Sequence, residues 1–127
     1  MTAVREKFKE ATAKDMERFG NRYVEVAGPL ATPCWLWKPN EKHNEKGYAY
    51  FWFDGKWRRA HIFSWQQKRK RTVRCDRYNR KLVLDHMCNR RNCVNPEHTQ
   101  EVTQSMNLLM IYRRGSDSFV QPVLQIA

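Results

Sequence analysis

The sequence predicts a small α+β fold stabilised by a bound zinc ion, and three observations predict it. Asp54-Gly55 separates two short segments rich in aromatic and basic residues, which is typical of a β-hairpin. Apolar residues recur at helical spacing near the start of the chain and again after residue 61. Cys88, Cys93 and His98 lie five residues apart among turn-forming residues, a spacing typical of a zinc-binding loop.

A chain of 127 residues is expected to form one domain. We divide it into an N-terminal helical extension (1–25), a zinc-stabilised core (33–114) and a C-terminal tail (115–127). No apolar run approaches the roughly 18 residues of a membrane span, and residues 1–14 lack the apolar centre of a signal peptide. We therefore expect a cytoplasmic protein without membrane contact, whose four cysteines are thiols or metal ligands before they are disulfides.

The net charge of +11 is concentrated in one part of the chain. Residues 56–91 hold 13 of the 24 Lys and Arg residues but only two of the 13 Asp and Glu residues, so the remainder is neutral. A solvated face is the ordinary explanation of a charge run, but an unbalanced run beside metal-ligand residues favours a nucleic-acid partner. The residues that we expect to contact DNA are Lys56, Arg58, Arg59, Arg74, Arg77, Arg90 and Arg91.

The first predicted element is an amphipathic helix over residues 4–19, ended near Gly20. Its apolar side carries Val4, Phe8, Ala11, Met16 and Phe19, and core packing alone explains that stripe.

The hairpin is predicted to pair Tyr48–Phe53 with Lys56–His61 through a type I′ turn. One face would carry Trp57, Arg59 and His61, and the other Lys56, Arg58 and Ala60. We expect Trp52, Phe53 and Trp57 to build the core. Arg58 and Arg59 should contact phosphate or bases, because two adjacent arginines in a strand cannot both be buried cheaply.

The second half of the chain predicts a helix, two strands and a further helix. The first helix covers residues 61–71 with Ile62 and Trp65 inward and its cations at the carboxyl end. After a basic loop at 74–81, a buried strand over 82–84 would deliver Asp85 and His86, and residues 99–102 would pair back against it. Thr103 is expected to cap a last helix over 104–114, which Gly115 would end.

A structural zinc ion requires a fourth ligand beyond Cys88, Cys93 and His98, and Cys34 is the best candidate because aromatic neighbours indicate a packed position. The alternative is that these residues are ordinary buried thiols and a surface histidine. Cys75 is expected to be a free thiol. Asn95 is expected to tie the loop through side-chain to backbone hydrogen bonds.

Several separated motifs occur in an order that resembles a known family. The segments 34–37, 85–88 and 91–98, together with Val102-Thr103 and Asn107, resemble the HNH endonucleases of phages and mobile introns. Their spacing is also similar to that of the His-Cys box homing endonucleases. The resemblance covers roughly residues 33–110. It implies a ββα-metal (HNH, or His-Me finger) nuclease core, a structural zinc ion and one catalytic Mg²⁺ or Mn²⁺ ion. If a phage encodes the chain, we expect the protein in the cytoplasm of the host cell.

The chemistry of phosphodiester hydrolysis assigns roles to the remaining polar residues. His86 is expected to be the general base, because a histidine is neutral at physiological pH and can take a proton from water. Asn107 and Asp85 offer hard oxygen ligands for Mg²⁺, although neighbours on a regular strand point to opposite faces, so the strand must end or twist there. In related enzymes an arginine or histidine near Arg59 and His61 assists at the scissile phosphate.

The sequence therefore predicts a divalent-metal-dependent DNA endonuclease. The alternative is a non-catalytic, zinc-stabilised DNA-binding module, which would keep the zinc ligands and basic residues but has no need for Asp85, His86 and Asn107 together. Charge alone does not distinguish DNA from RNA as the partner, and a homodimer is left open.

Overall fold

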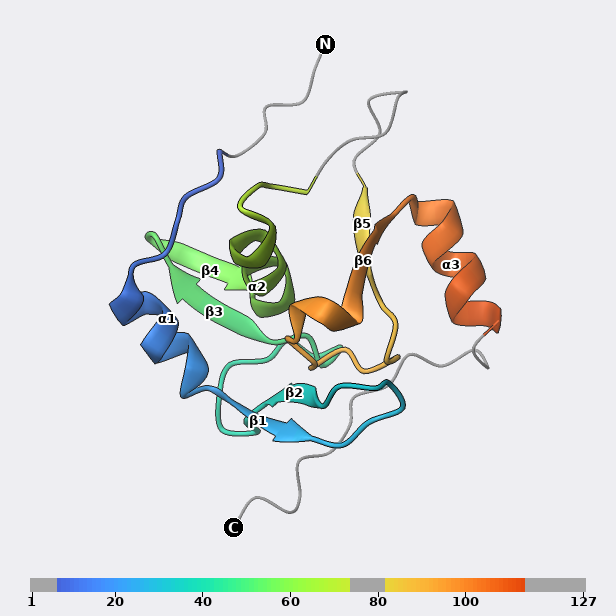
Figure 1. Cartoon of the computed structure of the whole chain (residues 1–127), viewed down its shortest axis with the longest axis horizontal. Coiled ribbons are helices and arrows are strands. Elements are labelled where there is room, and N and C mark those ends of the chain that lie inside the picture. Colours follow the sequence, from blue (N-terminus) through green and yellow to red (C-terminus); the bar gives the residue numbers. More distant parts are fainter. Residues whose placement is uncertain (1–6, 74–81, 114–127) are drawn as a thin grey trace.

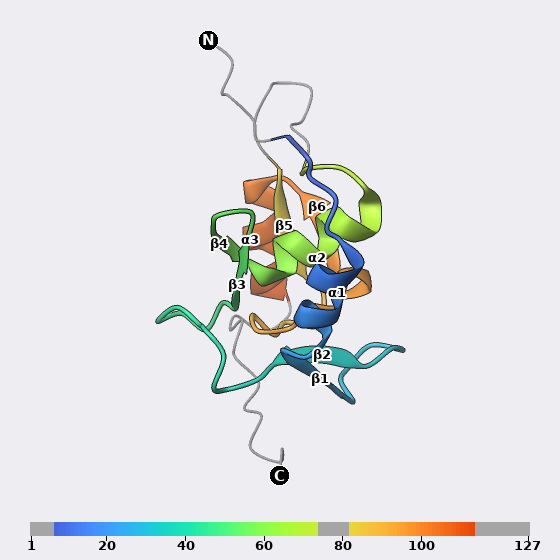
Figure 2. The same ribbon diagram turned by 90° about the vertical axis from the view of Figure 1, so that its left-hand side faces the viewer.

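The computed structural model describes residues 7–73 and 82–113. Within these ranges, three helices, a short 3-10 helix and three two-stranded antiparallel sheets form a small α+β structure, so the predicted α+β class is confirmed (Figures 1 and 2). In chain order the elements are α1 (Ala13–Gly20), β1 (Tyr23–Val26), β2 (Cys34–Trp37), β3 (Tyr50–Phe53), β4 (Lys56–Arg59), α2 (Ala60–Arg69), β5 (Val83–His86), η1 (Pro96–His98), β6 (Thr99–Val102) and α3 (Gln104–Arg113).

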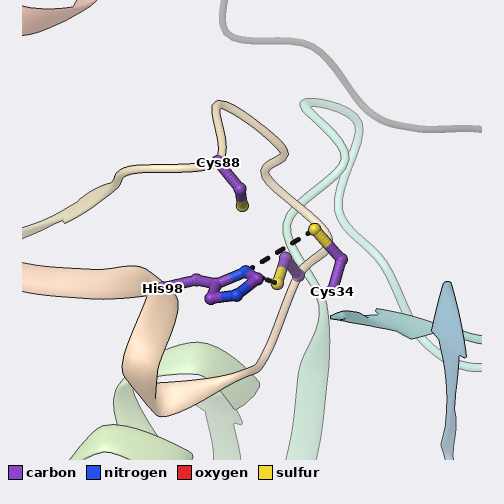
Figure 3. A group of neighbouring side chains, drawn as sticks. Cys34, Cys88 and His98 are labelled. Carbon is purple, nitrogen blue, oxygen red and sulfur yellow. Dashed lines mark hydrogen bonds between the residues drawn. The ribbon is translucent and has the colours of Figure 1, made fainter. Parts of the chain in front are cut away.

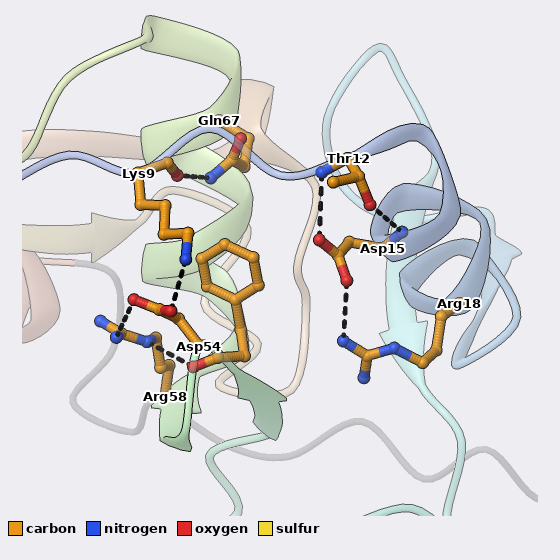
Figure 4. Close-up of polar contacts among 8 residues, drawn as sticks. Lys9, Thr12, Asp15, Arg18, Asp54, Arg58 and Gln67 are labelled. Atoms are coloured by element: carbon orange, nitrogen blue, oxygen red, sulfur yellow. Dashed lines mark hydrogen bonds and ion pairs between the residues drawn. The ribbon is translucent and has the colours of Figure 1, made fainter.

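The predicted start of the first helix is wrong, because α1 begins only at Ala13. The hydroxyl oxygen of Thr12 accepts from the Asp15 N–H at 3.1 Å and the Asp15 carboxylate accepts from the Thr12 N–H at 3.0 Å, a capping box that starts the helix. The preceding segment is held against α2 instead. The Gln67 Oε1 accepts from the Ala11 N–H at 2.9 Å, and the Gln67 Nε2 donates to the Lys9 carbonyl at 2.9 Å, the contact drawn in Figure 4. Val4 lies outside the described residues.

Aromatic rings from four elements make up most of the largest core cluster. Phe19 of α1 lies 5.3 Å from Trp37 of β2 and 5.1 Å from Phe51 of β3, measured between ring centroids. Phe63 of α2 completes the cluster at 4.8 Å from Phe51. The core therefore joins the N-terminal helix to the hairpin and to α2, and it fixes one face of the hairpin as the inner face.

The β3–β4 hairpin confirms the predicted turn and corrects the predicted burial of its two tryptophans. Asp54 and Gly55 both have positive φ, 52° and 80°, as a type I′ turn requires. Phe53 is buried as predicted, but Trp52 and Trp57 are a cross-strand pair on the outer face and are 47% and 48% exposed. The prediction that they build the core is wrong, because Phe51 and Phe53 occupy the face that meets α1 and α2.

The second predicted strand of the hairpin is too long, because the chain becomes helical at Ala60. His61 therefore lies in the first turn of α2 rather than on a strand face. Helix α2 ends at Arg69 and is followed by the C-cap residue Lys70, whose φ of 60° is left-handed, and Lys68 and Arg69 occupy its last turn as predicted. Trp65 is buried, also as predicted.

The β5–β6 hairpin and α3 follow the predicted order. Val83 pairs with Val102 and His86 with Thr99, so β5 extends two residues beyond the predicted strand and includes Asp85 and His86. The hydroxyl of Thr103 accepts from the Met106 N–H at 3.1 Å, which confirms the predicted cap of α3. Figure 1 places α2 and α3 on opposite sides of this hairpin. Gly115 lies outside the described residues.

Among the described residues, none of the helices has the length and apolar character needed to cross a membrane.

Candidate metal centre and the neighbouring histidine pair

Four buried side chains from separate parts of the chain form a cluster of metal-ligand atoms. Cys34 begins β2, Cys88 and Cys93 come from the loop after β5, and His98 ends η1 (Figure 3). Their sulfur and nitrogen ligand atoms all lie within 4.8 Å of one another. The His98 Nδ1 lies 3.6 Å from the sulfurs of both Cys34 and Cys93. The structure thus brings together the four residues predicted to bind zinc, including the distant Cys34.

Backbone pairing between the loop and β2 builds this cluster. The Trp37 N–H donates to the Asn92 carbonyl at 3.0 Å, and the Val94 N–H donates to the Trp35 carbonyl at 2.8 Å. The loop therefore runs beside β2 as a short added edge and carries Cys93 next to Cys34.

Asn95 ties the loop as predicted. Its Oδ1 accepts from the Glu97 N–H at 3.0 Å and its Nδ2 donates to the Pro33 carbonyl at 2.8 Å. The first bond caps η1, which ends at His98, and the second anchors the turn to the residue before Cys34. Asn95 therefore sets the position of two ligands without being a ligand itself.

A hydroxyl beside His98 orients its ring for metal binding. The Nε2 of His98 lies 2.7 Å from Oγ1 of Thr32. With the Nε2 proton donated to this hydroxyl, Nδ1 carries the lone pair that faces the sulfurs. Three sulfurs and one correctly oriented imidazole, all buried, fit a metal ion such as zinc. Cys75 lies outside the described residues.

The thiols are electrostatically coupled. Hydrogen bonds from the Cys88 and Cys93 thiols, together with the nearby Arg90 guanidinium, lower the pKa of Cys34. The same bond to Cys34 raises the pKa of Cys88 to about 11, and the pKa of Cys93 is also raised.

Gly28 and Arg90 pack directly against this cluster. A Cβ atom on Gly28 would lie 2.7 Å from the Cys34 sulfur and 2.9 Å from the Arg90 Nη1, both too close for a side chain. Arg90 Nη1 also donates to the Ala27 carbonyl at 3.3 Å. Arg90, a predicted DNA contact, thus has its guanidinium beside the metal-ligand cluster.

A pair of buried histidines lies beside the metal-ligand loop. His86 ends β5, and its Nε2 lies 3.1 Å from the Cys93 carbonyl oxygen, which must accept the hydrogen bond. The His86 ring centroid is 4.5 Å from that of His61, in the first turn of α2. Burial, and then the neighbouring His86 and Arg59, hold the pKa of His61 well below its ordinary value of 6.5, so His61 is neutral.

The Tyr48 ring contacts both this histidine pair and two arginines. Its ring centroid is 5.7 Å from that of His61 and 6.2 Å from that of His86. The guanidinium carbons of Arg59 and Arg91 lie 4.9 Å and 5.7 Å from the same ring centroid. Two cations and two imidazoles therefore converge on one tyrosine. The sequence analysis placed Tyr48 at the start of a predicted strand and assigned it no role, since no motif marks it.

Asp85 points to the other side of β5 from His86. Its Oδ2 accepts from the Gln100 Nε2 at 3.0 Å, and the same amide lies 3.3 Å from the Met110 sulfur on α3. Asn107 precedes Met110 by one turn and so shares a face of α3 with it. Asp85 thus lies on the side of β5 toward α3, the helix that carries Asn107, whereas His86 faces the loop and α2.

The predicted DNA contacts differ in their surroundings. Arg59 and Lys56 are exposed on β4, whereas the Arg58 side chain is only 18% exposed. The Arg58 Nε donates to the Phe53 carbonyl at 2.9 Å and its guanidinium lies 3.8 Å from the Asp54 carboxylate (Figure 4). Arg58 therefore stabilises the hairpin turn through its contacts with Phe53 and Asp54. Arg74 and Arg77 lie outside the described residues.

Comparison with protein-family models, curated proteins and solved structures finds no match to this chain. Function must therefore be inferred from the two neighbouring clusters.

Proposed function

We propose that this chain is a divalent-metal-dependent DNA endonuclease of the HNH type, as in homing or phage enzymes, and that His86 is its general base. The observation that carries the proposal is the surroundings of His86. A backbone carbonyl holds one of its ring nitrogens, and two arginines beside Tyr48 lie close enough to bind an anionic substrate. A base next to an anion site is what phosphodiester hydrolysis requires.

The hydrogen bond from His86 to Cys93 selects the tautomer of the base. Because a carbonyl only accepts, the proton of neutral His86 resides on Nε2. Nδ1 is then the nitrogen that takes the proton from the attacking water. The same carbonyl stabilises the imidazolium that results, and it keeps the ring from rotating during the reaction.

Arg59 and Arg91 would bind the scissile phosphate. A phosphodiester repels a nucleophile because it is anionic, and guanidinium groups neutralise this charge with paired N–H donors. Tyr48 holds the two guanidinium groups on one ring, and Arg91 is also fixed by a bond from Nη1 to the Lys46 carbonyl at 3.2 Å. The substrate phosphate would then lie next to His86.

Asp85 and Asn107 are the residues that would hold a catalytic Mg²⁺ or Mn²⁺ ion. Asp85 is a buried carboxylate near the end of β5, and Asn107 lies near the start of α3, which packs against β5, so two hard oxygen donors lie on neighbouring elements. Such an ion, when bound, supplies Lewis-acid stabilisation of the charge on the phosphate and on the leaving 3′ oxygen.

The cluster of Cys34, Cys88, Cys93 and His98 would hold a structural zinc ion. Its loop supplies the Cys93 carbonyl, so a bound ion would hold in place the acceptor that orients the base, without touching substrate. The order β5, loop, β6 and α3 is also the order expected of a ββα-metal nuclease core. This agreement in element order supports the proposal.

The competing function is a zinc-stabilised DNA-binding module without catalysis. The basic residues and the metal-ligand cluster suit it equally well, but it leaves the buried position of His86 beside the arginines unexplained. Incubation of zinc-loaded protein with supercoiled plasmid separates the two. Relaxation or linearisation in Mg²⁺ or Mn²⁺, but not in a chelator of these ions, is expected of the nuclease.

Binding without cleavage at every ion and salt concentration would favour the module instead. A labelled RNA of the same sequence, assayed in parallel, distinguishes the two nucleic acids as substrates.

A further inference from the structure

The outer face of the β3–β4 hairpin exposes two tryptophans that the core does not use. Trp52 and Trp57 face each other across the strands with ring centroids 5.3 Å apart and planes at 75°. They are 47% and 48% exposed, whereas Phe51 and Phe53 on the inner face are buried. About half of each of these two tryptophan residues is thus available to a partner.

The groups around this tryptophan pair are cationic. The Lys42 ammonium lies 5.1 Å from the Trp57 ring centroid. Arg59 follows Trp57 by two residues on the same face of β4, about 7 Å along the strand. The acid at the turn, Asp54, is paired with Lys9 at 2.6 Å and with Arg58 at 3.8 Å, so its charge is compensated (Figure 4). An aromatic surface with a cationic border is complementary to nucleic acid.

We propose that Trp52 and Trp57 form a stacking platform for unpaired bases of a nucleic-acid strand. An indole ring stacks only on a base whose face is exposed, which excludes the interior of an intact duplex. The platform lies on the same hairpin face as Arg59, so a strand whose phosphate lies at Arg59 and Arg91 has its neighbouring bases at the tryptophans. This placement rests on the proposed function, because it takes Arg59 and Arg91 as the phosphate site.

A cross-strand tryptophan pair can also serve only to stabilise its hairpin. In that case substitution lowers the stability of the fold and leaves the affinity for nucleic acid unchanged. A protein partner is the other class of ligand for exposed tryptophans, and it too predicts no effect on binding to oligonucleotides.

The test measures binding of zinc-loaded, full-length Trp52→Thr and Trp57→Thr variants to a labelled single-stranded oligonucleotide and to its blunt duplex. Threonine keeps strand propensity while removing the ring. We expect affinity for the single strand to fall roughly 5- to 150-fold for each ring that stacks on a base, and affinity for the duplex to change less. The salt dependence should stay the same, because no phosphate contact is lost.

The Tyr112→Ala variant is the matched control, since Tyr112 is an aromatic residue of α3 that is 78% exposed. It should bind both oligonucleotides like the wild type. Wild-type affinity in both tryptophan variants, or an equal loss for single strand and duplex, would overturn the platform.

Photo-crosslinking of the wild-type protein avoids any dependence on how the variants fold. Single strands that carry iodouracil are expected to crosslink to Trp52 or Trp57, and crosslinks found only at other residues contradict the proposal. Cleavage distinguishes the two proposals. If the protein crosslinks at these tryptophans but never cuts plasmid, the nuclease proposal is wrong and the stacking platform is retained. If the protein cuts plasmid but crosslinks only at other residues, the platform is wrong and the nuclease proposal is retained.

Discussion

The Nε2 of His86 lies 3.1 Å from the carbonyl oxygen of Cys93, so one residue supplies both a ligand atom of the metal-ligand cluster and the acceptor that orients the histidine. The metal-ligand cluster and the histidine pair therefore share Cys93, and the position of one depends on the position of the other. Any change that displaces the Cys93 loop is expected to displace the His86 ring as well.

Metal analysis tests the cluster directly. We expect one zinc ion per chain after dialysis, and loss of that ion in Cys34→Ser or Cys93→Ser, because a four-ligand site without one thiolate binds far more weakly. Mass spectrometry under native conditions counts the metal. Cys75→Ser should retain full occupancy, and folded wild-type protein without a tightly bound metal would exclude a structural zinc site.

Gly28→Ala should weaken the metal site through steric overlap. The added methyl would lie 2.7 Å from the Cys34 sulfur and 2.9 Å from the Arg90 guanidinium, so we expect a loss of about 1–3 kcal/mol in the free energy of unfolding, together with weaker zinc affinity. Denaturant unfolding and a competing chelator measure the two effects. Gly20→Ala is the control, since its Cβ would meet nothing within 4 Å. Equal stability of the two variants would contradict the packing described for Gly28.

His86→Ala should separate folding from cleavage. Its loss removes the proposed base but no ligand of the cluster, so zinc content and DNA affinity should remain while cleavage falls by roughly 10²- to 10⁴-fold. Asn107→Ala should also lower activity, but partly recover at high Mg²⁺ or Mn²⁺, because one lost oxygen ligand weakens ion binding only. Plasmid cleavage across ion concentrations measures both. The assigned roles are wrong if His86→Ala loses its zinc or cuts normally.

Adjacent arginines on β4 should behave differently. Arg59→Ala is expected to lower DNA affinity and to reduce the slope of log affinity against log salt by about one unit, as for one lost phosphate contact. Arg58→Ala should mainly lower stability, because Arg58 bonds the Phe53 carbonyl and faces Asp54. Binding isotherms at several salt concentrations and thermal unfolding give the two readouts. A larger change of slope for Arg58→Ala would place the DNA on the other face of the hairpin.

The buried His61 should make stability depend on pH. Its folded-state pKa lies well below 6.5, so under mildly acidic conditions the unfolded chain binds a proton that the folded chain does not. The stability contribution is therefore complete above about pH 6.5 and decreases by up to about 1.4 kcal/mol per pH unit below it. His61→Phe should remove this part of the pH dependence in denaturant unfolding. Parallel pH profiles for wild type and His61→Phe would show that His61 is protonated in the folded protein.

Local features of this protein follow from neighbouring residues and can be predicted from the sequence. Asp54-Gly55 specifies its turn because both positions need positive φ, and Thr103 caps α3 through a bond to a residue three positions away. The metal-ligand set could also be predicted, since Cys88, Cys93 and His98 share one short loop. Cys34 was the one distant member, and its aromatic neighbours marked it as buried.

Only the tertiary structure decided which groups meet across the chain. The Gln67 contacts hold residues 9–11 against α2, and packing of Phe19 on Phe51 turns Trp52 and Trp57 outward. The convergence of Tyr48, His61 and His86 likewise depends on how α2 lies against the β5 loop. Such contacts are determined by the volume and shape of the shared core, and a sequence pattern reports only which residues prefer burial, not which partner they will find.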